Sequence, residues 1–355
     1  MSSTELVRLA FDEIDVSSGL AAWLAEQQLS LALTKGNSIG FIGLDAHDSV
    51  TYSDVQFGMC MGLAALGDQT LYLATRYQIW RLENGVPDGG HSEAGHDRLY
   101  IPQTAWTTGT VLVRDLMVAA DGEVTFVNGL FSCLSRPSAR LNFEPVWLPP
   151  FVSKLASEDR CHLSGIASRD GRPAFVTSAS RSDTPRGWSE QQRDGGIVVS
   201  VATGAVIATG LSMPCSPVLH EGRLWVCLGG SGELGVLELG SGEVTKVATL
   251  PGFTRGLAIH DGYAVVCVSG PSRGESFDGL PLSDRLHDGD ARGRCGVYVV
   301  NLTSGAVEHW LRFAGGVSEI HALALLPGVR SASVVSFAGD DAQELVTLPA
   351  EVSER

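Results

Sequence analysis

The chain has 355 residues, of which 44% are hydrophobic and 18% charged, which describes a compact globular protein rather than a disordered one. A net charge of −15 excludes a nucleic-acid partner, because binding phosphates needs a basic face. No apolar run approaches the roughly 20 residues that a membrane-spanning helix needs, so we expect no membrane partner.

The N-terminal sequence MSSTELVRLAFDEIDVSS carries acidic residues early and has no basic start followed by an apolar stretch, which argues against a secretory signal. None of the seven cysteines forms a CxxC pair. Cys227 and Cys267 lie inside apolar runs, where a buried, reduced thiol is the usual state. We therefore expect a cytoplasmic protein with free thiols.

Residues 18–35 have helical spacing of Leu20, Trp23, Leu24 and Leu29, which predicts an N-terminal helical segment within residues 1–36. From residue 37 to residue 349 the chain consists of short apolar runs separated by Gly, Asp-Gly or Pro turns. This pattern predicts an all-β domain. Residues 350–355 form a tail.

The apolar runs repeat. RGLAIHDGYAVVCV (255–268) aligns with CSPVLHEGRLWVCL (215–228), and four other stretches fit the same pattern of strand, turn and strand. The residues that begin the six copies are Met61, Arg114, Ser164, Cys215, Arg255 and His321. A second turn follows inside most copies, for example GSGEV (240–244), so each copy holds four antiparallel strands.

Units of this length stack around an axis as the blades of a β-propeller. The repeats predict a single propeller of six blades, with seven as the alternative. After Gly328 only SASVVSF (331–337) and ELVTLPA (344–350) remain, so we expect the C-terminal part of the chain to give the last blade about three strands, and SIGFIGL (38–44) to supply the fourth and close the ring. The polar, Gly-rich insertion at 271–294 is predicted to be a lid over the channel mouth and no part of the core.

Several stretches resemble an uncharacterised bacterial family, a domain of unknown function. They are TRYQIWRLENGVPDG (75–89), DRLYIP (97–102), VNGLFSCLS (127–135), EDRCHLSGIA (158–167), GLSMPCSPVLHEGRLWV (210–226), SGELG (231–235), PGFTRGLA (251–258) and CGVYVVNL (295–302). The resemblance covers roughly residues 18–330 and agrees with a propeller.

The resemblance also implies a site with two axial histidines and neighbouring acids, which would suit a divalent metal. This sequence departs from that pattern. It has Thr110, Leu112 and Arg114 where the family has acidic residues and a histidine, and Cys215 where the family usually has another histidine. Only His162 is retained, so we assign no metal ligands and expect no cofactor, with a divalent metal as the alternative.

The first residues of the blades begin the innermost strands, so their side chains can point into the axial channel. We predict four catalytic residues: His162 as the proton carrier, Arg114 and Arg255 as clamps on an anion, and Cys215 as a substrate contact or nucleophile. The predicted substrate-binding residues are Met61, Ser164, Glu319, His321 and Arg160.

Each assignment has a structural alternative. The arginines could pair with Asp115, Glu233 or Glu319, Cys215 could fill the space of a lost histidine, and the channel could hold only water.

The leading functional hypothesis is a small-molecule enzyme that uses acid–base chemistry at the channel mouth, as a lyase, isomerase, cyclase or hydrolase, in a specialised biosynthetic pathway. One alternative is a non-catalytic propeller that binds a peptide, protein or metabolite. The other is a metal-dependent hydrolase.

Overall fold

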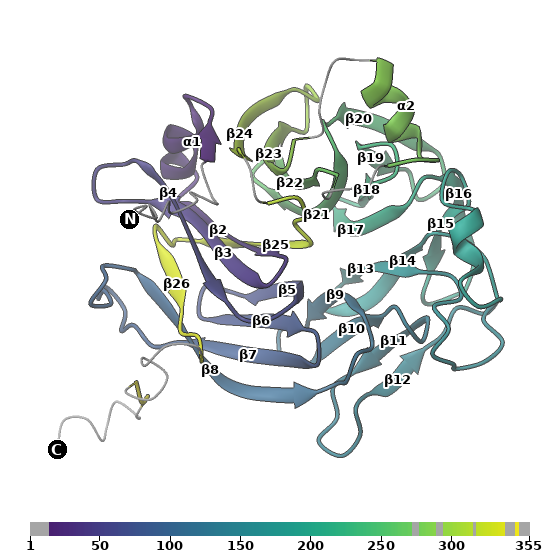
Figure 1. The fold of residues 1–355 in the computed structure, drawn as a ribbon, viewed down its shortest axis with the longest axis horizontal. Helices are drawn as coiled ribbons and strands as arrows, with labels where there is room; N and C mark the ends of the chain where they lie inside the picture. The colour runs from purple at the N-terminus through teal and green to yellow at the C-terminus, as the bar shows by residue number, and fades with distance from the viewer. Residues whose placement is uncertain (1–13, 272–276, 289–293, 315–316, 338–344, 348–355) are drawn as a thin grey trace, which may run out of the picture.

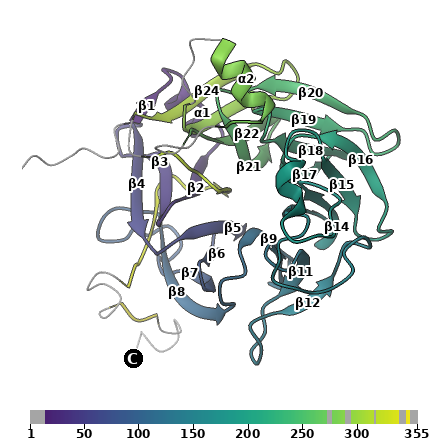
Figure 2. The same cartoon turned by 45° about the vertical axis from the view of Figure 1, so that its right-hand side comes forward.

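Six sheets stand around a common axis in the computed structural model, which describes residues 14–271, 277–288, 294–314, 317–337 and 345–347 (Figures 1 and 2). Each sheet is one blade of a β-propeller. The innermost strands surround the centre in Figure 1, and they are β25, β5, β9, β13, β17 and β21. The prediction of a six-bladed, all-β propeller is confirmed.

We number the blades 1 to 6 in this order around the ring. Blades 2 to 5 are built from consecutive strands, listed from the axis outward. Blade 2 contains β5 (Cys60–Leu66), β6 (Thr70–Thr75), β7 (Gln78–Asn84) and β8 (Arg98–Thr107). Blade 3 contains β9 (Val113–Val118), β10 (Val124–Asn128), β11 (Cys133–Arg136) and β12 (Glu144–Trp147). Blade 4 contains β13 (Leu163–Arg169), β14 (Arg172–Ser178), β15 (Gly196–Ser200) and β16 (Val206–Leu211), with the short helix η1 (Gly187–Glu190) between β14 and β15. Blade 5 contains β17 (Pro214–His220), β18 (Arg223–Leu228), β19 (Glu233–Leu237) and β20 (Val244–Thr249).

Blades 6 and 1 combine both ends of the chain. Blade 6 contains β21 (Phe253–His260), β22 (Tyr263–Ser269), β23 (Gly296–Asn301) and β24 (Val307–Phe313), with β1 (Ile14–Val16) as an outer fifth strand. Blade 1 contains β25 (Ala322–Pro327), β2 (Leu29–Lys35), β3 (Ser38–Leu44) and β4 (Val50–Gln56).

The two ends of the chain contribute different numbers of strands to the closing blade than we expected. The C-terminal part of the chain gives blade 1 one strand, and the N-terminal part gives it three. β25 pairs antiparallel with β2, with Thr34 opposite Ala322. β26 (Ala332–Val334), which we expected in this blade, instead adds to the outer edge of blade 2 and pairs parallel with β8. Of the stretch ELVTLPA (344–350), also expected there, only 345–347 are described, and they form no strand.

The predicted helical segment also needs correction. Helix α1 spans Leu20–Glu26, and the chain then turns at Gln28, whose φ is +48°, into strand β2. After β1, which adds to the edge of blade 6, the propeller strands therefore continue from Leu29, before the boundary expected at residue 37. Every residue of β2 is buried, because neighbouring blades cover both of its faces. A short apolar run of this kind cannot be told from a buried helix by its periodicity.

Two-residue turns join the inner strands of several blades, at the places where the sequence predicts them. The turns in blades 4, 5 and 6 are Asp170–Gly171, Glu221–Gly222 and Asp261–Gly262. Both residues of each turn have positive φ. Such turns match the twist of antiparallel strands, and glycine adopts this conformation without strain. They fix the register that places the first residue of each blade at the axis.

The insertion between β22 and β23 belongs partly to the core, contrary to the prediction. Leu280 and Leu282 are buried in a cluster that includes Trp225 of blade 5. Helix α2 (Pro281–Asp288) follows, and its Arg285 donates hydrogen bonds to the carbonyl oxygens of Ser231 and Leu250. The helix is therefore anchored on blade 5. Residues 273 and 275, which we placed in the lid, lie outside the described residues.

This anchoring predicts that Leu282→Ala lowers the free energy of unfolding by about 2–4 kcal/mol, because the fully buried side chain leaves a cavity. Asp284→Ala, on the same helix, is the control. Its side chain is 61% exposed, so we expect a change within about 0.5 kcal/mol. Urea unfolding of both variants measures the difference. Equal stability of the two would mean that α2 does not contribute to the core.

In the described part of the chain, neither helix has the length and apolar character needed to span a bilayer.

Candidate functional site

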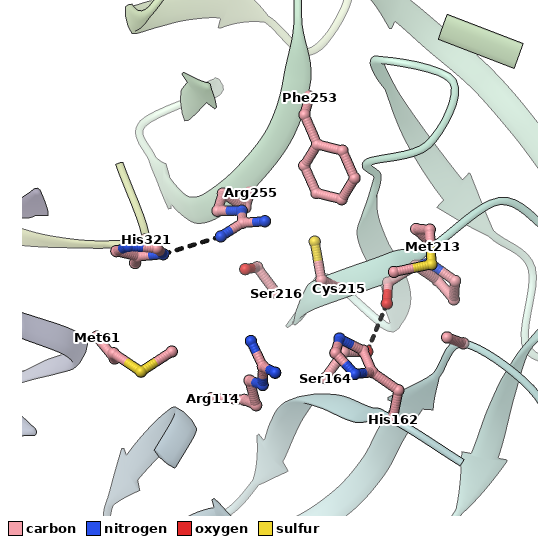
Figure 3. A pocket seen from close by; sticks show the side chains of 12 residues that line it. Met61, Arg114, His162, Ser164, Met213, Cys215, Ser216, Phe253, Arg255 and His321 are labelled. Atoms are coloured by element: carbon pink, nitrogen blue, oxygen red, sulfur yellow. Dashed lines mark hydrogen bonds between the residues drawn. The ribbon is translucent and has the colours of Figure 1, made fainter. Parts of the chain in front are cut away.

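A cavity of about 60 Å³ lies at the axis, where the inner strands converge (Figure 3). Its lining includes the predicted first residue of every blade. The lining residues are Met61, Arg114, His162, Ser164, Ala179, Met213, Pro214, Cys215, Ser216, Phe253, Arg255 and His321. The repeat alignment thus identified positions that are far apart in the sequence and that the fold brings to one space.

The order of the blades sets which side chains face each other. In a ring of six, blades three apart lie across the axis. Arg114 of blade 3 therefore lies opposite Arg255 of blade 6, and His162 of blade 4 lies opposite His321 of blade 1. Figure 3 shows both guanidinium groups directed into the space between them. The cavity therefore concentrates positive charge.

A second group of side chains in the lining comes from the position two residues before the first residue of a blade. His162, Met213 and Phe253 occupy this place in blades 4, 5 and 6, and all three line the cavity. His162 and Met213 have φ of +53° and +47°, a left-handed conformation that is uncommon for residues other than glycine. Strain of this kind is often found at functional sites. Met213, Phe253 and Ser216 were not predicted. Met213 and Phe253 could have been found by extending the repeat alignment two residues upstream.

Arg114 forms no ion pair within the part of the chain that the structure describes. Its Nε atom is buried without a hydrogen bond, and no carboxylate of the described residues lies within 4 Å of its guanidinium. Burial is the main cause that lowers the pKa of Arg114, and the charge of Arg255 acts in the same direction, whereas the charges of Asp159 and Glu319 raise it. Asp115, one of the partners that we considered, instead accepts hydrogen bonds from the backbone N–H groups of Leu116 and Ile166. Its burial raises its pKa to about 7.

Arg255 is held from two sides. It donates a hydrogen bond of 2.8 Å to Nδ1 of His321, and its guanidinium stacks on the ring of Phe253 at 4.8 Å. Because arginine can only donate, Nδ1 of His321 is the acceptor and Nε2 carries the hydrogen, which points toward Glu319 at 3.5 Å. Burial, together with the charges of Arg255 and Arg114, lowers the pKa of His321 to about 3. His321 is thus a neutral positioning residue for Arg255.

His162 is oriented by an acid, as its neighbours in the sequence suggested. Its Nδ1 lies 3.1 Å from Oδ2 of Asp159, and its ring packs on Trp188 of η1 with the ring centres 4.1 Å apart. Burial is the main cause that lowers the pKa of His162, and the charges of Arg114 and Arg255 add to it. A neutral ring whose Nδ1–H is held by Asp159 has its Nε2 lone pair available as a base.

Arg160 does not reach the cavity. Its guanidinium pairs with Glu158 at 2.7 Å and with Asp183 at 2.6 Å. The side chain is only 8% exposed, so these two carboxylates account for its charge. Of the nine predicted site residues, Arg160 and Glu319 therefore lie outside the lining of the axial cavity, and Glu319 lies beside His321, which lines it.

Two of the polar groups in the lining are already engaged. The Ser164 hydroxyl donates to the carbonyl oxygen of Pro214 at 2.6 Å and lies 3.0 Å from the Thr177 hydroxyl. The Cys215 thiol donates to the carbonyl oxygen of Thr254 at 3.3 Å. A hydrogen bond with the Cys227 thiol lowers the pKa of Cys215, and the charge of Arg255 acts in the same direction. Cys215 is therefore the more readily ionised thiol of the two.

A second cavity, of about 200 Å³, shares Arg255 and Phe253 with the axial one. Glu319 lines it, as do Gln192 of blade 4 and Phe277 and Asp278 of the insertion. Arg255 therefore stands at the junction of a small inner space and a larger, polar outer space. Residues of the insertion line part of this outer space, and a lid function of the insertion stays a prediction.

The donor groups do not suit a metal ion. Among the described residues, no three His, Cys, Asp or Glu side chains are grouped so that they could hold one. Nδ1 of His162 and Nδ1 of His321 each face a partner within the protein, and the two guanidinium groups repel a cation. The site suits an anion instead.

The comparisons with known proteins give a similar fold and a family, and no activity. No curated protein matches the chain. A chain of the nidogen/laminin complex is similar in structure, with 9% identity over 84% of this chain and 99% of that chain and a TM-score of 0.52. TolB from Acinetobacter baumannii gives 12% identity over 86% and 70%, with a TM-score of 0.47. A protein of unknown function from Bacteroides caccae gives 11% identity over 84% and 98%, with a TM-score of 0.40. The family model for "Domain of unknown function (DUF4915)" matches residues 18–335, and the chain belongs to this family.

Proposed function

We propose that the protein is an enzyme that acts on a small organic anion by acid–base chemistry in the axial cavity. The observation that carries this proposal is the pair of arginines that face each other across the axis. One of them, Arg114, forms no ion pair with a carboxylate of the described residues, and the more distant charges of Asp159 and Glu319 offset its charge only from beyond 4 Å. Two cationic groups in a confined, poorly hydrated space repel each other, and a bound anion removes that cost.

The size of the cavity limits the ligand. A volume of about 60 Å³ accommodates a carboxylate or phosphate group but not a whole metabolite of ordinary size. The remainder of the substrate would extend past Arg255 and Phe253 into the outer cavity of about 200 Å³, which is lined by polar groups such as Gln192 and Glu319. The substrate class is therefore a small acid with a polar extension.

His162 is the proposed base. Its neutral Nε2 would accept a proton from the carbon next to the bound acid group, while Asp159 keeps the ring oriented. The negative charge that develops on the substrate oxygens would be stabilised by Arg114 and Arg255. Cys215 would contact the substrate from blade 5. Returning the proton to another carbon gives an isomerase, and expelling a leaving group gives a lyase.

A non-catalytic function in binding is the second candidate. The observation in its favour is that the Ser164 hydroxyl and both ring nitrogens of His321 already have partners in the protein. These groups could hold the arginines and a ligand in place without taking part in a reaction.

One experiment separates the two candidates. Acetate, malonate, succinate, 3-hydroxybutyrate and inorganic phosphate are first titrated into the protein by calorimetry and thermal shift. Each ligand that binds is then incubated with the protein in D₂O and followed by proton NMR. The enzyme predicts loss of C–H signals next to the carboxylate, and His162→Gln should slow this exchange by about 10²–10⁴-fold while binding persists. Binding without exchange would favour the binding function, and absence of binding by all five anions would remove the basis of both.

A further inference from the structure

Two cysteines face each other in the wall of the axial cavity. Cys215 on β17 and Cys227 on β18 are register partners in blade 5, so their side chains lie on the same face of the sheet. Both belong to the same buried cluster. We propose that Cys215 and Cys227 are a modification site that a small hydroperoxide converts reversibly to a disulfide. This proposal does not depend on the activity proposed above.

The register makes the bond feasible without rearranging the backbone. Directly opposed residues of antiparallel strands have Cα atoms about 4.5–5.5 Å apart, and disulfides span about 4.4–6.8 Å. The two side chains point to the same face of the sheet and pack in the same buried cluster, which places the sulfur atoms on one side of the sheet. Only side-chain rotation is needed to join them.

Access comes from the cavity. Cys215 lines it and is 9% exposed, whereas Cys227 behind it is fully buried. A hydroperoxide of few heavy atoms fits a space of about 60 Å³ and would meet Cys215 first. Arg255 lines the same cavity, so a cation lies near the sulfur that must ionise to react.

The chemistry is balanced in two steps. The Cys215 thiolate attacks the outer oxygen of the hydroperoxide, the O–O bond breaks, and the alcohol leaves with a proton as Cys215 becomes a sulfenic acid. The Cys227 sulfur then attacks the Cys215 sulfur, and the hydroxyl leaves as water with the Cys227 proton. Two thiols and one hydroperoxide give one disulfide, one alcohol and one water. An added dithiol reverses the change by thiol–disulfide exchange.

The chain contains a matched control in the next blade. Cys267 on β22 occupies the place in blade 6 that Cys227 occupies in blade 5, and both are fully buried. The register partner of Cys267 is Arg255 rather than a cysteine. In the described strand pairs, no two other cysteines are register partners.

The test uses the reduced, full-length chain at pH 7.5 with a few equivalents of hydrogen peroxide. Alkylation of the remaining thiols under denaturing conditions, followed by peptide mapping, identifies which cysteines are linked. We expect a mass loss of two hydrogens and one cross-linked peptide pair, 215 with 227, which dithiothreitol removes. Cys267→Ala should form the same link at the wild-type rate, whereas Cys227→Ala should form none and should accumulate oxygen adducts on Cys215.

The mapping of the wild-type chain tests the proposal even if a variant fails to fold. A link between Cys227 and Cys267 would overturn it, as would oxygen adducts on Cys215 without any link. Oxidation that is at least about tenfold slower at Cys215 than at another cysteine would also overturn it, because Cys215 is the thiol beside a cation at the cavity.

Discussion

Replacing Arg114 by methionine should weaken the binding of a small carboxylate or phosphate by about 10²–10³-fold, because a charged, bidentate contact to the anion is lost. The same variant should gain about 1–2 kcal/mol in free energy of unfolding, because a largely buried charge without a carboxylate partner is replaced by an apolar side chain of similar length. We expect the lower end of this range because the guanidinium still borders the cavity. Function and stability thus change in opposite directions.

Arg160→Met is the matched control. The side chain of Arg160 is buried, whereas that of Arg114 is half-buried, and the charge of Arg160 is paired with Glu158 and Asp183 away from the cavity. Its replacement should lower stability and leave the affinity for the anion unchanged. Calorimetric titration with the tightest of the five anions and urea unfolding measure both quantities. If Arg114→Met destabilises the protein and still binds the anion, then Arg114 has a structural role and the proposed site is wrong.

The repeat predicted the fold and the location of the cavity because both follow from periodicity. The first residue of a blade lies at the axis whatever its side chain is, so aligning the turns was enough to bring Met61, Arg114, Cys215 and His321 together. The sequence could not reveal which charges are balanced. Each of the two arginines, Arg160 and Arg114, is next to an aspartate in the sequence. Only Arg160 is paired with carboxylates, because Asp115, the neighbour of Arg114, accepts a hydrogen bond from the backbone of blade 4.

The two wrong predictions about the fold, a helical segment that extends to residue 36 and an insertion outside the core, have a common physical origin. Strand β2 and residues Leu280 and Leu282 lie in segments whose local pattern does not show which neighbour covers them. β2 has helical spacing near its start, and the insertion has a polar composition, but packing between blades 1 and 6 and on blade 5 decides their burial. Such contacts between segments distant in the sequence are invisible to a local pattern.

His321 provides the second large effect, which concerns the response of stability to acid. Its pKa is lowered from 6.5 to about 3 in the folded protein, so the unfolded chain binds a proton in a pH range where the folded protein does not. The contribution of His321 to the free energy of unfolding is therefore fully present above pH 6.5, and it is lost as the pH falls from 6.5 toward 3. Between pH 7 and pH 5 the loss amounts to about 2 kcal/mol.

Other groups titrate in the same range, so the wild-type curve alone does not isolate His321. His162, whose pKa is also lowered, adds a loss of the same sign. Asp115 acts in the opposite direction, because its pKa is raised from 3.8 to about 7 and its carboxyl group favours the folded state as it becomes protonated. The difference between the wild-type protein and a variant that lacks the imidazole cancels both contributions.

His321→Gln is the appropriate variant, since the glutamine carbonyl can still accept the hydrogen bond from Arg255. We expect the loss of unfolding free energy between pH 7 and pH 5 to be about 2 kcal/mol smaller in this variant than in the wild-type protein. His91→Gln, between β7 and β8 and away from the cavity, is the control for the removal of an imidazole elsewhere in the chain. Urea unfolding at half-unit intervals of pH measures the difference. Parallel curves for all three proteins would mean that His321 is charged in the folded state, and a charged His321 could not accept the hydrogen bond from Arg255 that holds this side of the cavity in place.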